Sequence, residues 1–495
     1  IDGALGADHP VLVVSDQAIP VDVIVGRSWL DLPHIGFYKL RDQFIIETLS
    51  AIDPTATLDT VSSEITELQT ALVNAEPPMR SPILPSDINL DARIPEVERD
   101  ELLELINRYR DVFAKSLSEL GCTPLLEMDI VEVAGSVPVR QKPYRTSPTD
   151  RRVISDILDD WKSAGIISDS TSPYASPVLL VDKGGGEKRL CVDYRRLNVQ
   201  TRNQPYPMPD IDDLLSRLAE GLIFTTLDLS NGFLQIPLSE EAKQKTAFVT
   251  EETTAKFERM PFGLKGAPGM FQKTMNIVFQ DLKNAGLVHV YLDDIIIPSK
   301  DWPDMLSVVQ RVFDALRKAR LTLKLKKCTF GADKLNFLGF TISSGVIRPG
   351  PKVHVIENFP RPRDAHEVRR FLGLTGYFRR FVVNYAKLVA PLTYLTGKNV
   401  PYVWGETQQQ SFAELRKRLC HAPVVRMFDP KANVTQVHTD ASSVALSGIM
   451  LQGPTTNELH MVYAVSKKTT AAESKYHSSR LELYAVIWTL NRLRP

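Results

Sequence analysis

Apolar and polar positions change their spacing several times along this chain, and each change marks a predicted element. Short β-branched runs separated by turns fill residues 1–48 and predict strands. Residues 49–94 instead gather prolines among serine, threonine and acidic residues, which is typical of a linker, with one short helix near residues 65–73. At residues 95–113 apolar side chains return at the spacing of an amphipathic helix.

Helical and strand patterns alternate between residues 130 and 345. Helices are predicted at residues 147–164, 209–219, 266–284 and 303–319. The pattern then becomes mainly helical over residues 364–420, and strand patterns resume at residue 434. This mixed order predicts an α+β core rather than a regular series of parallel βαβ units.

Composition and charge narrow the class of protein. Lys plus Arg and Asp plus Glu each number 59, so the chain is not a polycation, although a local basic groove is still compatible with it. The 4 cysteines form no CxxC pair and the 9 histidines no HExxH motif, so any metal ion should be held by carboxylates, in a reducing compartment. Apolar runs are too short for a membrane span, and no association with membranes is expected.

The N-terminus gives two expectations about cellular context. It has no charged segment followed by an apolar core, so no secretory signal is predicted. The first residue is not Met, which indicates a chain that begins inside a longer polyprotein. We therefore expect a cytoplasmic or nuclear protein that is not secreted.

An Asp-Asp pair between two apolar arms is the most informative segment. Residues 288–297 place Asp293 and Asp294 at the turn of a predicted β-hairpin. Adjacent acids held close to a buried sheet repel each other, which costs free energy unless a cation compensates. Taken alone, the segment fits a polar hairpin tip better than a catalytic site.

A second strand changes this interpretation, because residues 224–229 carry a single acid, Asp228, at the strand end. If the two strands are neighbours, the three carboxylates converge at one edge of the sheet. Carboxylate oxygens suit Mg²⁺. Two such ions about 3.5–4 Å apart activate a 3′-hydroxyl and stabilise a leaving pyrophosphate. The predicted reaction class is nucleotidyl transfer.

Six motifs then occur in the order found in the polymerase polyproteins of gypsy-like long-terminal-repeat retrotransposons, relatives of the retroviruses. They are SPYASP at 172–177, RLCVDYRRLN at 189–198, LDL at 227–229, MPFGL at 260–264, YLDD at 291–294 and LTLKLKKC at 321–328. The chain resembles this family strongly over residues 95–495 and weakly over residues 1–48. The resemblance implies an α+β right-hand polymerase with fingers, palm and thumb, followed by a truncated RNase H-like α/β fold.

The same resemblance implies the domain boundaries. They are residues 1–48 for the C-terminal remnant of an aspartic protease-like β domain, 49–94 for a linker, 95–345 for fingers and palm, 346–430 for thumb and connection, and 431–495 for a partial RNase H-like domain. Residues 23–30 resemble the closing part of a retroviral-type protease. No Asp-Thr/Ser-Gly occurs in the chain, so no proteolysis is expected.

The resemblance also assigns roles at the polymerase site. Asp228 and Asp293 would be the catalytic ligands of two Mg²⁺ ions, with Mn²⁺ as an alternative, and Asp294 their less direct partner. Contacts to the incoming dNTP are implied for Lys183, Arg189, Leu229, Phe233 and Phe262. Lys183 and Arg189 would bind the triphosphate together with the Leu229 backbone amide. Phe233 would exclude a 2′-hydroxyl and Phe262 would pack near the sugar. The structural alternatives are a solvated hairpin for Lys183 and Arg189 and a core aromatic for Phe233.

Nucleic acid would lie against a short basic stretch without acids. Its members are Arg317, Lys318, Arg320, Lys324, Lys326 and Lys327. A solvated helix face is the alternative, but beside a polymerase site a groove for the phosphate backbone is favoured. The implied partners are an RNA template, a DNA primer, an RNA–DNA hybrid, dNTPs and other parts of the Pol and Gag polyproteins, within a virus-like particle.

Near the C-terminus, Asp440 on a predicted strand and Glu482 on a predicted helix match the first two acids of an RNase H domain. The chain stops before the third acid, so RNase H activity is expected to be lost and the edge of the first strand to remain exposed. The leading hypothesis is an RNA-directed DNA polymerase. An RNA-dependent RNA polymerase fits Phe233 poorly, and a decayed or host-adopted nucleic-acid-binding remnant is the remaining alternative.

Overall fold

The computed structural model describes the backbone of residues 35–40 and 43–48 and, further along the chain, residues 80–90, 94–182, 188–218, 221–421 and 425–493. The chain forms two units, Ile1–Ser81 and Pro82–Pro495. In the first unit, strands β1 (Ile35–Leu40) and β2 (Gln43–Thr48) pair as an antiparallel hairpin. The helix expected at residues 65–73, the protease-like residues 23–30 and the side chain of Lys183 lie outside the described residues.

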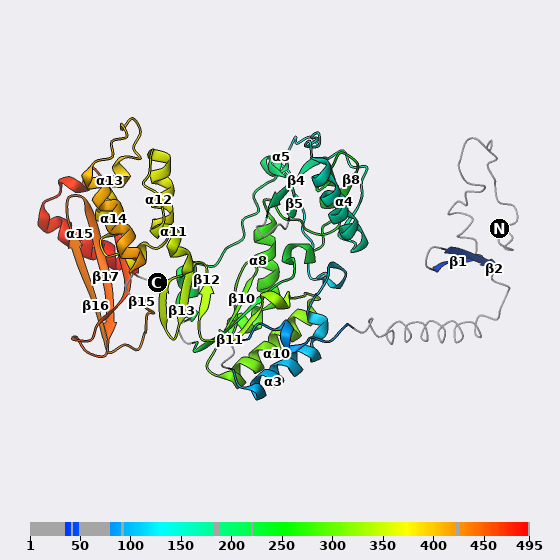
Figure 1. Ribbon diagram of the computed structural model, residues 1–495, viewed down its shortest axis with the longest axis horizontal. Helices are drawn as coiled ribbons and strands as arrows, with labels where there is room; N and C mark the ends of the chain where they lie inside the picture. Colours follow the sequence, from blue (N-terminus) through cyan, green and yellow to red (C-terminus); the bar gives the residue numbers. More distant parts are fainter. Residues whose placement is uncertain are drawn as a thin grey trace. The chain divides into compact units, whose positions relative to one another are not determined.

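A four-stranded antiparallel sheet carries the predicted acids. Its order is β11-β6-β10-β9, formed by Thr329–Ala332, Ile223–Asp228, Asp294–Ser299 and His289–Tyr291. Helix α10 (Trp302–Lys318) lies on one face of this sheet with α3 (Glu96–Arg108) beside it (Figure 1). The Asp301 side chain accepts the N–H of Asp304 and begins α10, whose apolar side chains are buried in the core. The helix predicted at 303–319 is confirmed as α10. The helical pattern predicted at 95–113 is confirmed as α3 up to Arg108, and a separate 3-10 helix, Arg110–Val112, follows.

A second, mixed sheet of five strands precedes and interleaves with the first along the chain. Its order is β3-β8-β7-β4-β5, formed by Ile167–Asp169, Thr254–Phe257, Phe248–Val249, Ser176–Asp182 and Lys188–Val192. Helix α4 (Pro148–Ser163) begins where the Ser147 hydroxyl accepts the N–H of Asp150. The helix expected at 147–164 is therefore confirmed, with Ser147 as its cap.

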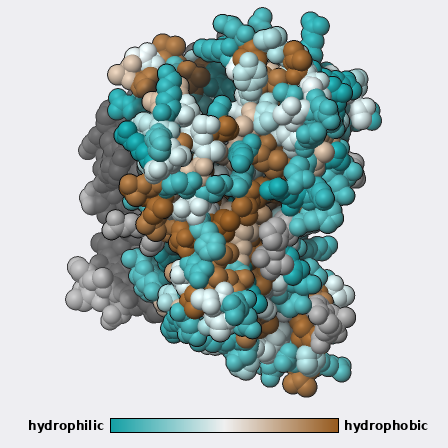
Figure 2. Space-filling view, turned by 90° about the vertical axis from the view of Figure 1, so that its left-hand side faces the viewer, coloured by the Kyte–Doolittle hydropathy of each residue, from teal (hydrophilic) through white to brown (hydrophobic). Residues whose placement is uncertain are grey.

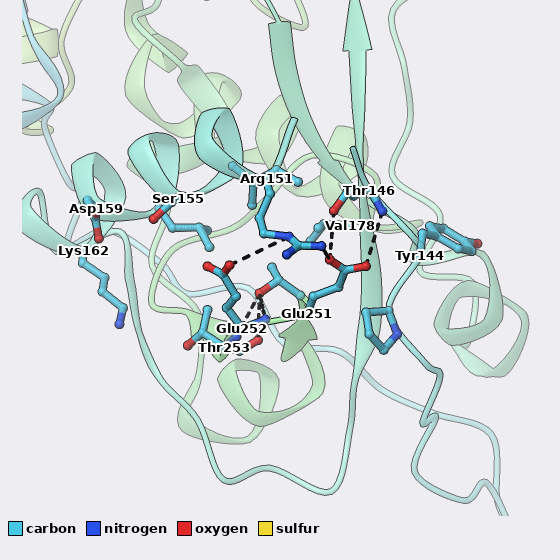
Figure 3. Close-up of a pocket in the computed structure, with 14 residues that line it drawn as sticks. Tyr144, Thr146, Arg151, Ser155, Asp159, Lys162, Val178, Glu251, Glu252 and Thr253 are labelled. Carbon is cyan, nitrogen blue, oxygen red and sulfur yellow. Dashed lines mark hydrogen bonds and ion pairs between the residues drawn. The ribbon is translucent and has the colours of Figure 1, made fainter. Parts of the chain in front are cut away.

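A cavity of about 140 Å³ lies between α4 and the turn that joins β7 to β8 (Figure 3). The guanidinium of Arg151 spans it, forming ion pairs with Glu251 and, at 3.8 Å, with Glu252. Thr146 also donates to the Glu251 carboxylate at 3.3 Å. These contacts connect α4 to the turn between β7 and β8. None of the predicted site residues lines the cavity.

The following segment packs around a third sheet and four helices, in a core that also includes Phe224 and Ile296 of the first sheet. The strand order is β12-β13-β14-β15, formed by Leu335–Phe337, Phe340–Ser343, Val346–Pro349 and Val425–Arg426. The helices are α11 (His354–Glu357), α12 (Ala365–Tyr377), α13 (Tyr385–Tyr394) and α14 (Glu406–Cys420). Phe371 of α12 and Phe412 of α14 pack with ring centroids 4.7 Å apart. The mainly helical pattern predicted for 364–420 is confirmed.

The last element group is a three-stranded antiparallel sheet with one helix. Strands β16 (Val434–Ala441), β17 (Ala445–Gly453) and β18 (His460–Lys468) follow in order, and α15 (Ser478–Leu493) packs on β16 and β17. In the described part of the chain β16 pairs with β17. The opposite face of α15 exposes Leu483, Val486, Ile487 and Leu490, and apolar residues gather on this side of the molecule (Figure 2).

Close packing of α15 depends on a glycine in β17. A Cβ built on Gly448 would lie 2.2 Å from Cγ2 of Thr489, a fully buried residue of α15. Gly448→Ala is therefore expected to lower the free energy of unfolding by roughly 1–3 kcal/mol, measured by thermal denaturation. Gly373→Ala on α12 is the matched control, because no atom lies within 4 Å of its Cβ and alanine favours helix. Equal stability of both variants would contradict the prediction.

Among the described residues, no helix is long and apolar enough to cross a membrane. The other helices that position the site are α6 (Ile211–Arg217), α8 (Ala267–Val278) and α9 (Gln280–Asn284). The first confirms the helix predicted at 209–219. The helix predicted at 266–284 is present as α8 and α9, divided at Phe279.

Candidate active site

The register of two strands brings the predicted acids together. Asp228 is the last residue of β6 and stands directly opposite Asp294, the first residue of β10. Asp293 lies in the two-residue turn that joins β9 to β10. The expected hairpin and the expected neighbouring strand are both present, so three carboxylates lie at one edge of the sheet.

The turn itself has an unusual backbone. Leu292 has φ of +53°, in the left-handed region that non-glycine residues rarely occupy. Its N–H donates to Oε1 of Gln272 at 2.8 Å, and Nε2 of Gln272 donates to the carbonyl of Val290 at 3.3 Å. Gln272 is a fully buried residue of α8. One side chain therefore bonds to backbone groups on both sides of Tyr291 and fixes the turn that carries Asp293.

Sequence reasoning missed Gln272 and also Gln235, which is fully buried after β6. Gln235 donates through Nε2 to the carbonyls of Ser230 and Thr322 and accepts the Thr322 N–H through Oε1 at 2.7 Å. It thereby joins the segment after Asp228 to the segment before Lys324. The available sequence signal for such a residue is a polar side chain at a position that the apolar spacing of a helix assigns to the buried face, as for Gln272 on α8.

A glycine lets the backbone pass close to the acids. A Cβ on Gly232 would lie 2.8 Å from the Phe271 ring and 3.2 Å from Oδ1 of Asp293. Gly232 begins the 3-10 helix η5 (Gly232–Gln235), after Asn231 with φ of +45°. Only glycine leaves room at this position for both the aromatic ring and the carboxylate.

The carboxylates disfavour one another's charge. Burial, followed by repulsion from Asp228 and Asp294, raises the pKa of Asp293 to about 6. Burial and the Asp228 charge likewise raise the pKa of Asp294. Oδ1 of Asp293 is buried and has no hydrogen-bond partner among the described residues. Such a cluster is stabilised by a cation.

A lysine supplies one cation to this cluster. Nζ of Lys327 lies 3.1 Å from each carboxylate oxygen of Asp228. Lys327 ends the 3-10 helix η6 (Leu325–Lys327), and the N–H of Lys324 donates to the backbone carbonyl of Asp228 at 2.9 Å. The basic stretch is therefore joined directly to the acidic edge.

Four residues predicted to contact a nucleotide lie in the described part of the chain, and three of them form a cluster. The rings of Phe233 and Phe262 lie 4.8 Å apart, and the guanidinium carbon of Arg189 lies 4.0 Å above the Phe262 ring. Phe233 also contacts Phe271 at 5.1 Å, beside Gly232. Leu229 follows Asp228 and has a buried side chain. The cluster adjoins Asp293 through Gly232.

The six basic residues do not share one environment. Arg317 forms a bidentate ion pair with Asp111 and lies 4.2 Å above the Tyr109 ring, so it attaches α10 to the segment after α3. Lys327 bonds to Asp228, as described above. The other four have exposed side chains and are Lys318, Arg320, Lys324 and Lys326. Arg317 thus has a structural role that its place in a charge run did not reveal.

The two predicted RNase H acids are on elements that pack together. Asp440 is the second-last residue of β16 and Glu482 lies early in α15, and both are exposed. Lys467 of β18 lies between Glu473 and Tyr484, 2.9 Å from an oxygen of each. Hydrogen bonds to Thr470 and Lys467 hold the pKa of Glu473 at about 2. The hydrogen bond from Lys467 to Tyr484 joins the sheet to α15.

The chemistry of the three acids suits a divalent cation. Carboxylate oxygens are hard ligands, Oδ1 of Asp293 is buried without a hydrogen-bond partner, and a cation would offset the repulsion among the carboxylates. Within the described residues, no three His, Cys, Asp or Glu side chains surround one point at metal-binding distance.

Comparisons with known proteins agree with this arrangement. The family model for "Reverse transcriptase (RNA-dependent DNA polymerase)" matches residues 181–342, and that for the "RNase H-like domain found in reverse transcriptase" matches residues 404–495. The retrovirus-related Pol polyprotein of transposon 297 from Drosophila melanogaster is 34% identical over 421 residues, which cover 83% of this chain and 38% of the relative. That of transposon gypsy from the same organism is 30% identical over 427 residues, covering 83% and 40%.

Solved structures extend the similarity in fold. A foamy viral protease-reverse transcriptase in complex with double-stranded DNA matches with a TM-score of 0.75 and 21% identity, over 92% of this chain and 80% of that one. The foamy viral enzyme in complex with an RNA/DNA hybrid matches with a TM-score of 0.68 and 24% identity, over 83% and 54%. At these identities the likeness shows the fold.

Fold, site and family matches together define a reverse transcriptase domain followed by an RNase H-like domain. The chain is a region of an LTR-retrotransposon Pol polyprotein, with gypsy-like relatives at about 30% identity. It spans less than half the length of these curated relatives. Reverse transcriptases as a family use divalent metal ions.

Proposed function

We propose that this chain catalyses RNA-directed DNA synthesis, adding dNTPs to the 3′-hydroxyl of a primer. The observation that carries the proposal is the strand register that sets Asp228 opposite Asp294, with Asp293 in the adjoining turn. Family membership supports the reaction class. The related foamy viral structures hold double-stranded DNA and an RNA/DNA hybrid, which supports the same substrates here.

In this proposal the chain's residues position the reactants. Asp228 and Asp293 would hold two Mg²⁺ or Mn²⁺ ions with Asp294 beside them, and these ions would activate the 3′-hydroxyl and stabilise the leaving pyrophosphate. Arg189, supported on the Phe262 ring, presents a planar set of donors to the triphosphate. The Leu229 backbone amide, and Lys183 outside the described residues, complete this grip. Phosphoryl transfer depends mainly on such positioning and charge.

Nucleic acid is proposed to lie along the four exposed cations Lys318, Arg320, Lys324 and Lys326. Phosphate contacts of this kind make binding depend strongly on salt concentration. For the RNase H-like domain we propose Asp440 and Glu482 as two of its acids. Degradation of the RNA strand of a hybrid that disappears in Asp440→Asn would support this assignment.

Primer extension on an RNA template tests the main proposal. The chain should extend a DNA primer with dNTPs, depend on added Mg²⁺ and fail with rNTPs. Extension with rNTPs instead would indicate an RNA polymerase. Salt-sensitive binding of the hybrid with no extension under any divalent ion would favour the alternative, a decayed remnant that binds nucleic acid.

Phe233 provides a separate prediction about sugar selection. Its ring packs against Phe262 and Phe271 and is held in place between them. Phe233→Val should reduce discrimination against rNTPs by roughly 10- to 100-fold, because removal of the ring makes room for a 2′-hydroxyl. Phe233→Tyr, which keeps the ring, is the control. Single-nucleotide incorporation kinetics measure both, and an active Phe233→Val that still rejects rNTPs would refute this role.

A further inference from the structure

Lys327 occupies an unusual position for a residue of a nucleic-acid groove. Its ammonium lies 3.1 Å from both carboxylate oxygens of Asp228, the same two oxygens that a bound metal ion would use. The Asp228 side chain is 23% exposed, so the pair is partly removed from water. A divalent ion that uses these same oxygens has to compete with the ammonium.

The backbone around Lys327 is fixed while its side chain is not. The N–H of Lys327 donates to the carbonyl of Lys324, and the next residue, Cys328, is fully buried and donates to the carbonyl of Leu325. Thr329 then pairs with Thr226 in the sheet. The side chain of Lys327 is nevertheless 56% exposed, so the ammonium can leave Asp228 by rotation of its stem without any movement of the sheet.

The charge of Lys327 also reaches the other two acids. Asp294 stands opposite Asp228 in the strand register and Asp293 adjoins it in the turn, so the Lys327 ammonium lies at one cluster of carboxylates. One internal cation therefore offsets part of the repulsion among three carboxylates. A divalent ion would supply the same compensation with a larger charge.

We propose that Lys327 is an internal counter-ion of Asp228 that a divalent metal ion must displace, so that Lys327 weakens the metal affinity of the acid site and acts there as a positioning residue. This inference rests on the proposed function, because it assumes that the acids bind metal. The contact is specific to one lysine of the stretch: among the described contacts Lys326, on the same 3-10 turn, has no bond to an acid.

Direct metal binding tests the inference without any measurement of polymerisation. Mn²⁺ binding to the whole chain, without nucleic acid or nucleotide, is measured by electron paramagnetic resonance for Lys327→Gln and for Lys326→Gln. Both variants lose one positive charge from the same turn. Since a half-exposed ion pair is worth up to about 1 kcal/mol, Lys327→Gln should bind Mn²⁺ about three- to fivefold more tightly than wild type. Lys326→Gln should change the Mn²⁺ affinity by less than about twofold.

A double-mutant cycle isolates the contact from the general effect of charge. In an Asp228→Asn background, Lys327→Gln should no longer tighten Mn²⁺ binding. Equal affinities of the Lys327→Gln and Lys326→Gln variants, or an undiminished effect of Lys327→Gln in the Asp228→Asn background, would overturn the proposal. If either of these results is found, Asp293→Asn shows which level of the argument has failed. Weaker Mn²⁺ binding by this variant would mean that the metal site stands and only the counter-ion role is wrong, whereas unchanged Mn²⁺ binding would refute both.

Discussion

Primer extension by an Asp293→Asn variant is expected to fall by a factor on the order of 10⁴, the usual consequence of removing a group that acts directly on the reacting atoms. Asparagine keeps the size of the side chain but removes the negative charge of Asp293, which among the three clustered acids has the unpartnered buried oxygen. The fold and the binding of an RNA–DNA hybrid should be unchanged. Steady-state extension and hybrid affinity, measured on the same preparation, test both parts.

The same substitution should stabilise the protein when divalent ions are chelated. The pKa of Asp293 is raised from 3.8 to about 6, mainly by burial. An acid with a raised pKa in the folded state contributes stability that is present below pH 3.8 and is lost as the pH rises through 6. At pH 7 its ionisation therefore costs roughly 1–3 kcal/mol, after allowance for solvent screening, and asparagine avoids this cost.

Thermal denaturation as a function of pH measures this effect. The variant and wild type should have similar stability near pH 4, the variant should gain between pH 4 and 6, and the difference should be constant above pH 7. Added Mg²⁺ should reduce it by binding wild type more strongly. Asp281→Asn on α9, an exposed acid, is the control and should show no such gain. A stability difference that does not depend on pH would contradict the electrostatic explanation.

Elements with strong local signals could be predicted from the sequence. The helices α4 and α10 begin at Ser147 and Asp301, whose side chains cap them, and their apolar spacing fits burial on one face. The acids were predictable because Asp228 is the last residue of one short apolar strand and Asp294 the first residue of another, and two such strands bury their side chains best as neighbours. Their convergence follows from register, which local pattern restricts but does not determine.

Contacts between residues far apart in the chain could not be predicted. Arg317 pairs with Asp111 across 206 positions, and Lys327 pairs with Asp228 across 99. In the sequence, lysine and arginine in a basic run predict a solvated surface or a phosphate groove. The carboxylate partners can be identified only in the folded structure. The two buried glutamines were missed for the same reason, since their partners are backbone groups of loops whose path depends on the tertiary structure.

Gln272 leads to the second large expected effect. Gln272→Leu should reduce primer extension by about 100-fold, because displacement of a catalytic group by about 1 Å has consequences of this size. Leucine fills the buried space but cannot accept the N–H of Leu292, and the turn with φ of +53° would lose the bond that holds it. The partly buried N–H of Leu292, left unpaired, also lowers folding stability, by at most the roughly 1–3 kcal/mol of a fully buried donor.

Thr274→Val on the same helix is the matched control. Thr274 is also fully buried, but among the described residues its hydroxyl bonds to the Met270 carbonyl within α8 and to no other group. The control should therefore retain most of the extension activity even if it loses some stability. Mn²⁺ affinity distinguishes the cause: Gln272→Leu should bind Mn²⁺ more weakly than Thr274→Val, because Asp293 moves with Leu292. Equal losses of activity in the two variants would mean that α8 acts through its stability alone, and that the Gln272 bond does not position the acid.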